Sequence, residues 1–293
     1  MSRPRVVPVL TLFCVAALGM GCGKRDAPPV ADSSFDSARS PSTATQAPSD
    51  WSGELGQLLI VPSDSDNVGV VLYPEDPSAR LITSAPLTLL NAGGDTTRVK
   101  LVASDSQQCG DAPVVRLTGA GPASWTVGLL GRSARLLRMD SIETLTPADS
   151  ARLAADLARL ASALDSHKNS RFSGLPFSVM GARRFEADGR QYVAAHLARR
   201  LNQEALPLEE HTFLIAERPA HGASPDFYVV TYTLRSEGSE DTAEHFETLA
   251  SAHGRESLLL LLARDQLAQT TYEVLERSSL GKWRSRWSRK LVC

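Results

Sequence analysis

Beyond Trp51 the chain consists of short apolar runs separated by turn-forming residues, and this pattern restricts the fold more than any other feature. Short runs bounded by Gly, Pro, Asn, Asp or Ser are typical of β-strands. The sequence therefore predicts a body made mostly of antiparallel strands. The predicted strands cover residues 57–61, 68–73, 86–90, 97–102, 114–117, 125–130, 134–137, 177–185, 190–199, 212–216, 227–234, 258–263, 270–275 and 283–292.

Three of the predicted turns carry the residues that hairpins require. Asp188-Gly189 is the sharpest hairpin signal, because a two-residue turn of this kind needs residues that accept a positive φ. Asn91 to Asp95 contains two glycines and joins two further predicted strands. Ser278 to Gly281 precedes the last predicted strand, on which alternation places Trp283 and Trp287 on one face.

One helix interrupts the strands. Thr146 can cap a helix, Pro147 suits its first position, and Asp149 stands where the acid of a capping box would lie. Apolar residues then recur at helical spacing up to about residue 166 and form a stripe for the core. The stripe consists of Leu153, Leu157, Leu160 and Leu164. The fold class is therefore α+β, a mostly antiparallel β body with one amphipathic helix over about 147–166.

The segment 243–252 is ambiguous. Phe246, Leu249 and Ala250 fit one face of a helix, and Gly254 could form its C-terminal cap. The neighbouring run at Leu258 to Leu262 is too short to span a bilayer and is better interpreted as a core strand.

The first 21 residues have the order of a secretory signal peptide. Arg3 and Arg5 form a basic start, an apolar run covers residues 6–18, and small residues precede Cys22. This cysteine after small residues resembles the lipobox of bacterial lipoproteins. The resemblance implies that Cys22 is lipidated and becomes the first residue of the mature chain. The alternative is an ordinary signal peptide cut near Gly21, in which Cys22 has no special role.

Residues 22–50 are expected to form a disordered tether. The segment contains four prolines among Ser, Thr and Ala and almost no large apolar side chain, so it cannot offset the entropy of ordering. Its root-mean-square reach would be about 30 Å. Behind it we expect a β-rich part over 51–145 and a helix followed by a β-rich part over 146–293, which could form one unit.

Charge gives no case for nucleic acid as a partner. The chain has 31 Lys and Arg against 33 Asp and Glu. Removal of the signal peptide takes away Arg3 and Arg5, which leaves a net charge of −4. A nucleic-acid-binding domain usually has a basic balance or a basic stripe, and export separates this chain from nucleic acid as well.

The remaining cysteines support an oxidising compartment. Cys14 leaves with the signal peptide, so only Cys109 and Cys293 remain beside the lipid site. One disulfide between them is the expected arrangement for an exported protein, and it would tie the last residue to the early part of the body. The alternative is two unpaired thiols.

Two local motifs imitate functional sites. Asp64, Asp66 and Glu75 occupy positions of a calcium loop, but Val68 offers no side-chain oxygen and strands flank the loop, so a polar hairpin turn is favoured. His221, Ser224 and Asp226 supply the residue types of a hydrolytic triad within one short loop. A triad normally converges from separate elements, and no nucleophile elbow is present.

Two charged regions complete the candidates. Five acidic and histidine residues could supply zinc ligands, but their spacing matches no recognised zinc motif. The favoured interpretation of this group is a solvated charged surface. The group consists of Glu209, Glu210, His211, His245 and His253. The last strand is basic and could contact anionic lipid headgroups, although a charged edge that prevents unwanted pairing is favoured. Its basic residues are Lys282, Arg284, Arg286, Arg289 and Lys290.

We therefore expect a bacterial cell-envelope lipoprotein, held at a membrane by its lipid anchor, that acts without catalysis as a binding or scaffolding protein. Its partner would be an envelope protein or polymer, with no cofactor and no metal. The alternative is an envelope hydrolase whose site is built from scattered residues such as His221, Ser224 and Glu210. A buried cluster with perturbed pKa values inside a pocket would favour the hydrolase.

Overall fold

The structure is a computed structural model in which the described residues are 52–62, 68–74, 86–91, 94–119, 125–164, 170–202, 207–220, 228–278 and 280–292, without the side chains of 103–108. The chain divides into two units, Met1–Thr45 and Gln46–Cys293, and every described residue belongs to the second. The predicted signal peptide and tether lie outside the described residues. Among the described helices, none is long and apolar enough to cross a membrane.

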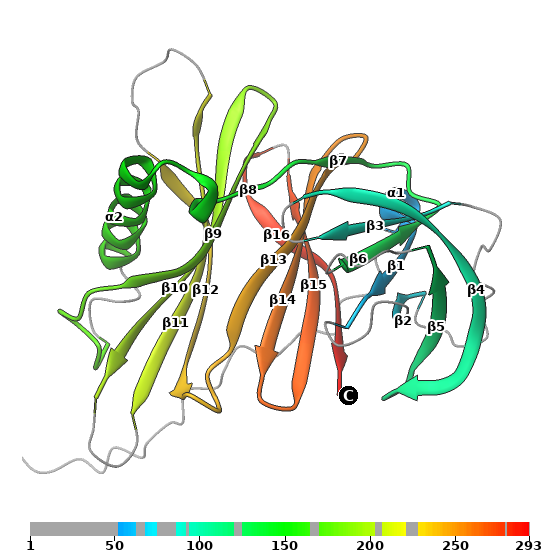
Figure 1. The fold of residues 1–293 in the computed structure, drawn as a ribbon. Coiled ribbons are helices and arrows are strands. Elements are labelled where there is room, and N and C mark those ends of the chain that lie inside the picture. The colour runs from blue at the N-terminus through cyan, green and yellow to red at the C-terminus, as the bar shows by residue number, and fades with distance from the viewer. Residues whose placement is uncertain are drawn as a thin grey trace, which may run out of the picture. The chain divides into compact units, whose positions relative to one another are not determined.

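The first strands of the body close into a barrel (Figure 1). Its six strands are neighbours in the order β1-β2-β5-β4-β3-β6. They are β1 (Gln57–Ile60), β2 (Val68–Tyr73), β3 (Leu87–Asn91), β4 (Thr96–Cys109), β5 (Ala112–Thr118) and β6 (Trp125–Leu130), after the short helix α1 (Ser52–Leu55). Apolar side chains such as Leu87, Val115 and Trp125 form one buried cluster of this barrel.

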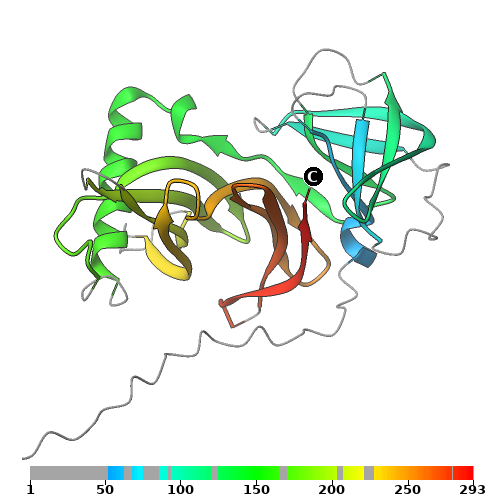
Figure 2. The ribbon, with the colours of Figure 1, turned by 90° about the horizontal axis from the view of Figure 1, so that it is seen from below.

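The next sheet, which we call the outer sheet, has the strand order β12-β11-β10-β9-β8. Its strands are β8 (Asp140–Ser141), β9 (Ser178–Ala187), β10 (Arg190–Leu201), β11 (Leu208–Pro219) and β12 (Val229–Ser239). The 3₁₀ turn η1 (Ile142–Thr144) and the helix α2 (Pro147–Ala163) follow β8. The helix α2 lies against one face of this sheet (Figure 2). Its residues Leu157 and Ala161 pack there with apolar residues of the sheet.

The last sheet, which we call the middle sheet, has the strand order β16-β15-β14-β13-β7. Its strands are β7 (Arg135–Leu137), β13 (His245–His253), β14 (Leu258–Gln266), β15 (Gln269–Arg277) and β16 (Trp283–Leu291). All strand pairs are antiparallel. The prediction of a mostly antiparallel β body with one long helix is confirmed for the described part of the chain.

Strand β14 is buried on both of its faces. Leu258, Leu260 and Leu262 belong to a cluster with Tyr192 and Phe213 of the outer sheet. The alternate residues pack in another cluster with residues of the barrel such as Leu58 and Leu72. These alternate residues are Leu259, Leu261 and Ala263. The run is continuously apolar because both faces of the strand need apolar side chains.

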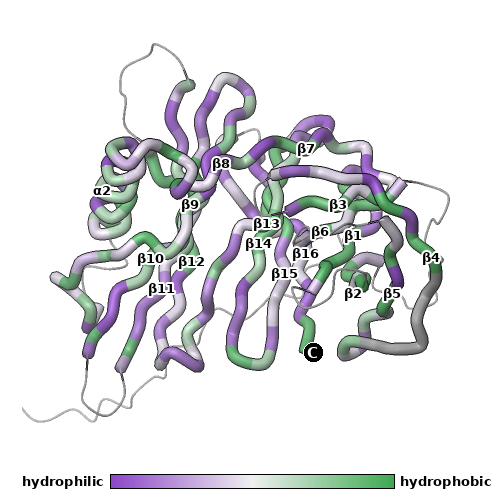
Figure 3. Tube along the Cα trace, in the orientation of Figure 1, coloured by the Kyte–Doolittle hydropathy of each residue, from purple (hydrophilic) through white to green (hydrophobic). Residues whose placement is uncertain are grey.

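The helix signals are confirmed in detail. The Thr146 hydroxyl accepts a hydrogen bond from the Asp149 backbone N–H at 3.2 Å and donates one to the Asp149 carboxylate at 2.8 Å. Leu157 is fully buried, and Leu153 and Leu160 pack against the same cluster, so the stripe is a core face. Hydrophobic and hydrophilic stretches are interspersed along α2 (Figure 3). The helix ends at Ala163, somewhat before the predicted end.

The Asp188-Gly189 hairpin is confirmed. Both residues have positive φ, 51° and 68°, and β9 pairs with β10 immediately on either side of them. The Asn91 to Asp95 hairpin is also present, where the Asn91 side chain accepts a hydrogen bond from the Asp95 backbone N–H at 2.9 Å.

The helical interpretation of residues 243–252 is wrong. The segment forms β13, and the pairing with β14 shifts between Thr248 and Ala250. This β-bulge explains the misleading pattern. One extra residue makes Phe246 face the outer sheet while Leu249 and Ala250 face the barrel, so the apolar spacing resembles a helix. Gly254 caps no helix, and its N–H donates to the Ser257 carbonyl in the following turn.

A second shift in strand pairing makes the predicted faces of the last strand wrong. The pairing of β15 with β16 skips Arg286, because Leu275 pairs with Ser285 and Val274 pairs with Trp287. Trp283 therefore packs beside Tyr192 in the outer-sheet cluster, whereas Trp287 packs with barrel residues and meets Tyr73 edge-on. The two tryptophans are core residues on opposite faces of the middle sheet, not on one face.

The end of β16 lies against the barrel. The buried Arg289 guanidinium donates to the Leu72 carbonyl at 2.7 Å and to the Asp111 carboxylate at 3.1 Å. A side chain at Gly110 would lie 3.0 Å from the Val292 carbonyl oxygen. Cys109 and the residue before Cys293 are therefore near one another. Cys293 itself lies outside the described residues, so the Cys109–Cys293 disulfide stays a prediction.

Candidate functional site

Several residues singled out from the sequence lie outside the described part of the chain. They are Cys22, Asp64, Asp66, Glu75, His221, Ser224, Asp226 and Cys293. The candidate site that the structure offers is built instead from two residues of the predicted polar group, His211 and His245, together with His196, which the sequence analysis did not single out.

Three histidines meet where the outer and middle sheets face one another. His196 lies on β10 and His211 on β11, and the pairing of Ala198 with His211 puts the two histidines two positions apart on one face. His245 begins β13 on the opposing sheet. One ring nitrogen from each histidine can be chosen so that all three lie within 4.8 Å of one another.

A chain of hydrogen bonds orders these rings. His211 Nε2 lies 2.9 Å from a carboxylate oxygen of Glu209, and His211 Nδ1 lies 2.8 Å from His196 Nε2. A carboxylate can only accept, so His211 donates from Nε2. Its Nδ1 then accepts a hydrogen bond from His196 Nε2–H when both imidazoles are neutral.

Burial keeps the imidazoles of His196 and His211 uncharged. Burial, followed by the nearby charges of His211 and His245, lowers the pKa of His196 to about 3. Burial also lowers the pKa of His211, against the opposing effect of its hydrogen bond to Glu209. The pair therefore presents neutral nitrogen atoms at neutral pH.

The position of His245 is set by its neighbour Glu244. The Glu244 carboxylate accepts hydrogen bonds from two guanidinium nitrogens of Arg264 of β14, from Nη2 at 2.8 and 2.9 Å and from Nε at 3.2 Å. The Glu244 backbone N–H donates to the Ser236 hydroxyl of β12 at 2.9 Å. Phe246, the next residue, meets the His196 ring edge-on at 5.6 Å between ring centres. The start of β13 is thus held to both sheets.

An open pocket of about 240 Å³ lies beside this cluster, with His196 and Phe246 in its wall. Gly181, the cross-strand partner of His196, has no side chain and leaves this space open. A Cβ placed on Gly181 would meet no atom within 4 Å. Basic and acidic side chains both line the pocket, among them Arg183 and Glu247. A second hollow of about 490 Å³ lies between the barrel and the middle sheet and contains no histidine.

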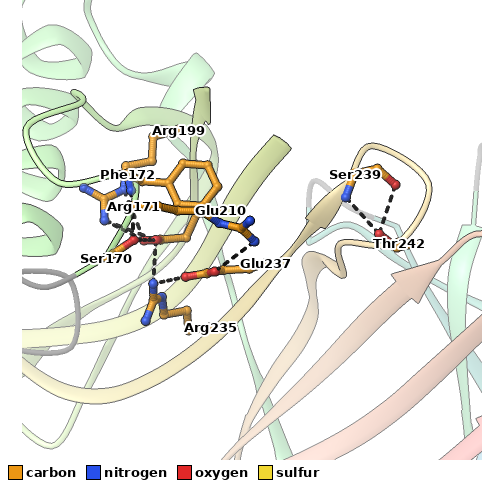
Figure 4. Close-up of polar contacts among 9 residues, drawn as sticks. All are labelled: Ser170, Arg171, Phe172, Arg199, Glu210, Arg235, Glu237, Ser239 and Thr242. Atoms are coloured by element: carbon orange, nitrogen blue, oxygen red, sulfur yellow. Dashed lines mark hydrogen bonds and ion pairs between the residues drawn. The ribbon is translucent and has the colours of Figure 1, made fainter. Parts of the chain in front are cut away.

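Glu210 belongs to a different network on the other face of the outer sheet. Its fully buried carboxylate accepts hydrogen bonds from Arg199 at 3.1 and 3.2 Å, from Arg235 at 2.8 Å and from Ser170 at 2.8 Å (Figure 4). Arg199 in turn lies over the Phe177 ring at 4.6 Å. The network ties β10, β11 and β12 to the residues that follow α2.

The interpretation of 209–211 as a solvated charged surface is therefore wrong. Glu210 and His211 are buried, because β11 is covered on both faces and adjacent residues point in opposite directions. Glu210 points toward the α2 side and His211 toward the middle sheet. His253 lies apart from the cluster, where its ring nitrogens bond to the Asp188 carboxylate and to the Gly254 carbonyl at 2.9 and 2.8 Å.

Three of the five basic residues of the last strand are bonded to acidic or carbonyl groups of the body. Arg284 and Arg286 both donate to Glu276 on the adjacent strand, at 2.8 and 2.6 Å, and Arg289 is buried against the barrel. Strand β16 forms the edge of the middle sheet. These contacts agree with the favoured interpretation as a charged sheet edge.

Comparison with known protein families, with characterised proteins and with solved structures finds no match to this chain. The site therefore has to be interpreted from its own geometry.

We expect replacement of Glu210 by Gln to destabilise the body strongly. The change leaves the buried Arg199 charge without its carboxylate, and losing one partner of a buried pair costs about 3–5 kcal/mol. Urea unfolding measures this loss as a decrease in the free energy of unfolding.

Glu237→Gln is the matched control. Glu237 also pairs with Arg235, but its side chain is 30% exposed, so its loss should cost less than about 1 kcal/mol. Equal losses for the two variants would contradict the structural role given to Glu210.

Proposed function

We propose that this chain is an exported, lipid-anchored protein of the bacterial cell envelope that binds a ligand or partner without transforming it. Cys22 would carry the lipid, residues 22–50 would form the tether, and the body behind them would present the pocket beside His196. The basic-apolar-small-Cys order at the N-terminus supports the anchor. The α+β label suits this body, whose one long helix packs on a single antiparallel sheet.

One observation carries the choice of binding over catalysis: the histidine and the serine that line the pocket are bonded to structural partners. Nucleophilic catalysis needs a hydroxyl or thiol within hydrogen-bond reach of a base. His196 is bonded to His211 instead. Ser141, which also lines the pocket, accepts a hydrogen bond from the Glu143 backbone N–H and caps η1. Charged and polar side chains around an open hollow suit recognition.

One observation supports the hydrolase alternative, and others oppose it. A buried histidine with a shifted pKa beside a pocket is the arrangement expected of an enzyme. Of the residues proposed for that enzyme, however, Glu210 is held by two arginines and a serine on the other face of the sheet. It cannot act as a base in this pocket. His221 and Ser224 lie outside the described residues.

We expect Cys22→Ser to move the protein from the membrane fraction to the soluble fraction. Serine cannot carry the thioether-linked lipid, so the variant loses the proposed attachment to the membrane. Fractionation of cells that express each form measures the change. A Cys22→Ser protein that remains with the membrane as the wild type does would contradict the lipid anchor.

We expect Gly181→Val to abolish ligand binding while leaving the fold intact. The valine side chain would occupy the open space across from His196, and a β-branched residue suits a strand. The measurement is the set of envelope components retained by the immobilised Cys22→Ser body in each form, read by mass spectrometry.

Thr233→Val is the matched control, because it adds the same side chain at an exposed position of β12 in the same sheet. It should retain the same components as the unaltered body. Equal retention by all three forms would rule out the pocket as the binding site, and turnover of a retained component would favour the hydrolase.

A further inference from the structure

We propose that His196, His211 and His245 together bind one divalent transition-metal ion. The inference goes beyond the proposed function, because it needs neither the lipid anchor nor the ligand of the pocket. It also departs from the expectation of no metal, which rested on the absence of a recognised ligand spacing. The spacing is hidden because the three residues come from three strands of two sheets.

The three rings lie close enough to hold an ion after an adjustment of the side chains. Zinc binds histidine nitrogen at about 2.0–2.1 Å, which places two tetrahedral nitrogen ligands about 3.3 Å apart. His196 Nε2 and His211 Nδ1 are 2.8 Å apart, and the chosen nitrogen of each of the three rings lies within 4.8 Å of the others. The first pair would have to separate by about half an ångström, and the widest separation in the group would have to shorten by up to about 1.5 Å. The His211 and His245 rings are already close, with centres 4.3 Å apart.

Glu209 supplies an independent sign of a metal site. Metal-binding histidines commonly donate their other ring N–H to a carboxylate, which fixes the tautomer and the ring orientation. His211 donates from Nε2 to Glu209 at 2.9 Å, so its Nδ1 lone pair points at His196. The hydrogen bond therefore presents the nitrogen that the ion would take.

The ligand set indicates the class of metal. Imidazole nitrogen suits zinc, copper and nickel, whereas magnesium and calcium prefer oxygen. Three protein ligands leave a fourth position for water or for a group of a bound molecule. Because His196 also lines the pocket, a ligand there would lie next to the ion. We use Zn²⁺ as the probe.

Neighbouring side chains hold the three histidine rings in place, so the site is preorganised. Phe246 packs on His196, Glu209 holds His211, and the Glu244–Arg264 pair fixes the residue before His245. Little ordering is therefore needed when an ion enters, which favours tight binding.

The experiment is calorimetric titration of Zn²⁺ into the chelator-treated, unreduced full chain carrying Cys22→Ser. We expect one ion per chain and no heat from Mg²⁺. His245→Asn should weaken binding at least a hundredfold by removing a ligand. Glu209→Gln should weaken it about 10- to 100-fold, because the partner of His211 loses its charge but can still accept a hydrogen bond.

His253→Asn is the matched control, since His253 lies outside the cluster and should leave Zn²⁺ affinity unchanged. Circular dichroism checks that each variant is folded, and the Zn²⁺-dependent rise in melting temperature gives a second measure of binding. His245 is half-buried at the first position of its strand, so its loss is expected to leave the fold intact.

Two outcomes would overturn the proposal. One is the absence of Zn²⁺ binding by the parent chain. The other is binding that His245→Asn and Glu209→Gln leave unchanged, which would assign the ion to other groups. Loss of binding in both variants, with His253→Asn unaffected, would support the site even if the envelope partner remained unidentified.

Discussion

The apolar strand β14 is the constraint on which the rest of the structure depends. Six consecutive apolar residues, Leu258 to Ala263, must leave water on both sides of the strand. The barrel meets that need on one face and the outer sheet on the other, with α2 covering the far face of the outer sheet. Each fully buried leucine is worth about 1.5–3 kcal/mol relative to an exposed one, so β14 holds these parts together.

Layers packed in this way bury polar side chains, and several of these buried groups have well-defined partners. Glu210 is matched by two arginines, Arg289 by barrel carbonyls, and His211 by Glu209 and His196. An unpartnered buried polar group would cost about 1–3 kcal/mol. The histidine cluster follows from the same arrangement, because it lies where the first residue of β13 meets the facing strands of the outer sheet.

Features that depend on neighbouring residues in the chain could be predicted from the sequence. Features that depend on pairing between distant strands could not. The Thr146 cap, the Asp188-Gly189 turn and the apolar run of β14 depend on neighbouring residues, so the sequence was enough to find them. The bulges in β13 and at Arg286 depend on pairing with other strands, and they reverse the faces that alternation predicts. His196 was missed for the same reason. It is 15 residues from His211, and only the register of β10 with β11 and the fold of β13 onto them reveal the cluster.

Native-state hydrogen exchange resolved by strand tests the central claim, that β14 joins the barrel and the outer sheet into one cooperative body. We expect the amides of residues 258–263 to be among the slowest in the protein and to exchange only by global unfolding. The slowest amides of β2 in the barrel and of β10 in the outer sheet should exchange with the same free energy of opening. Slow exchange in β2 or β10 that persists after β14 has exchanged would contradict the claim, because it would mean that these parts are stable without the strand between them.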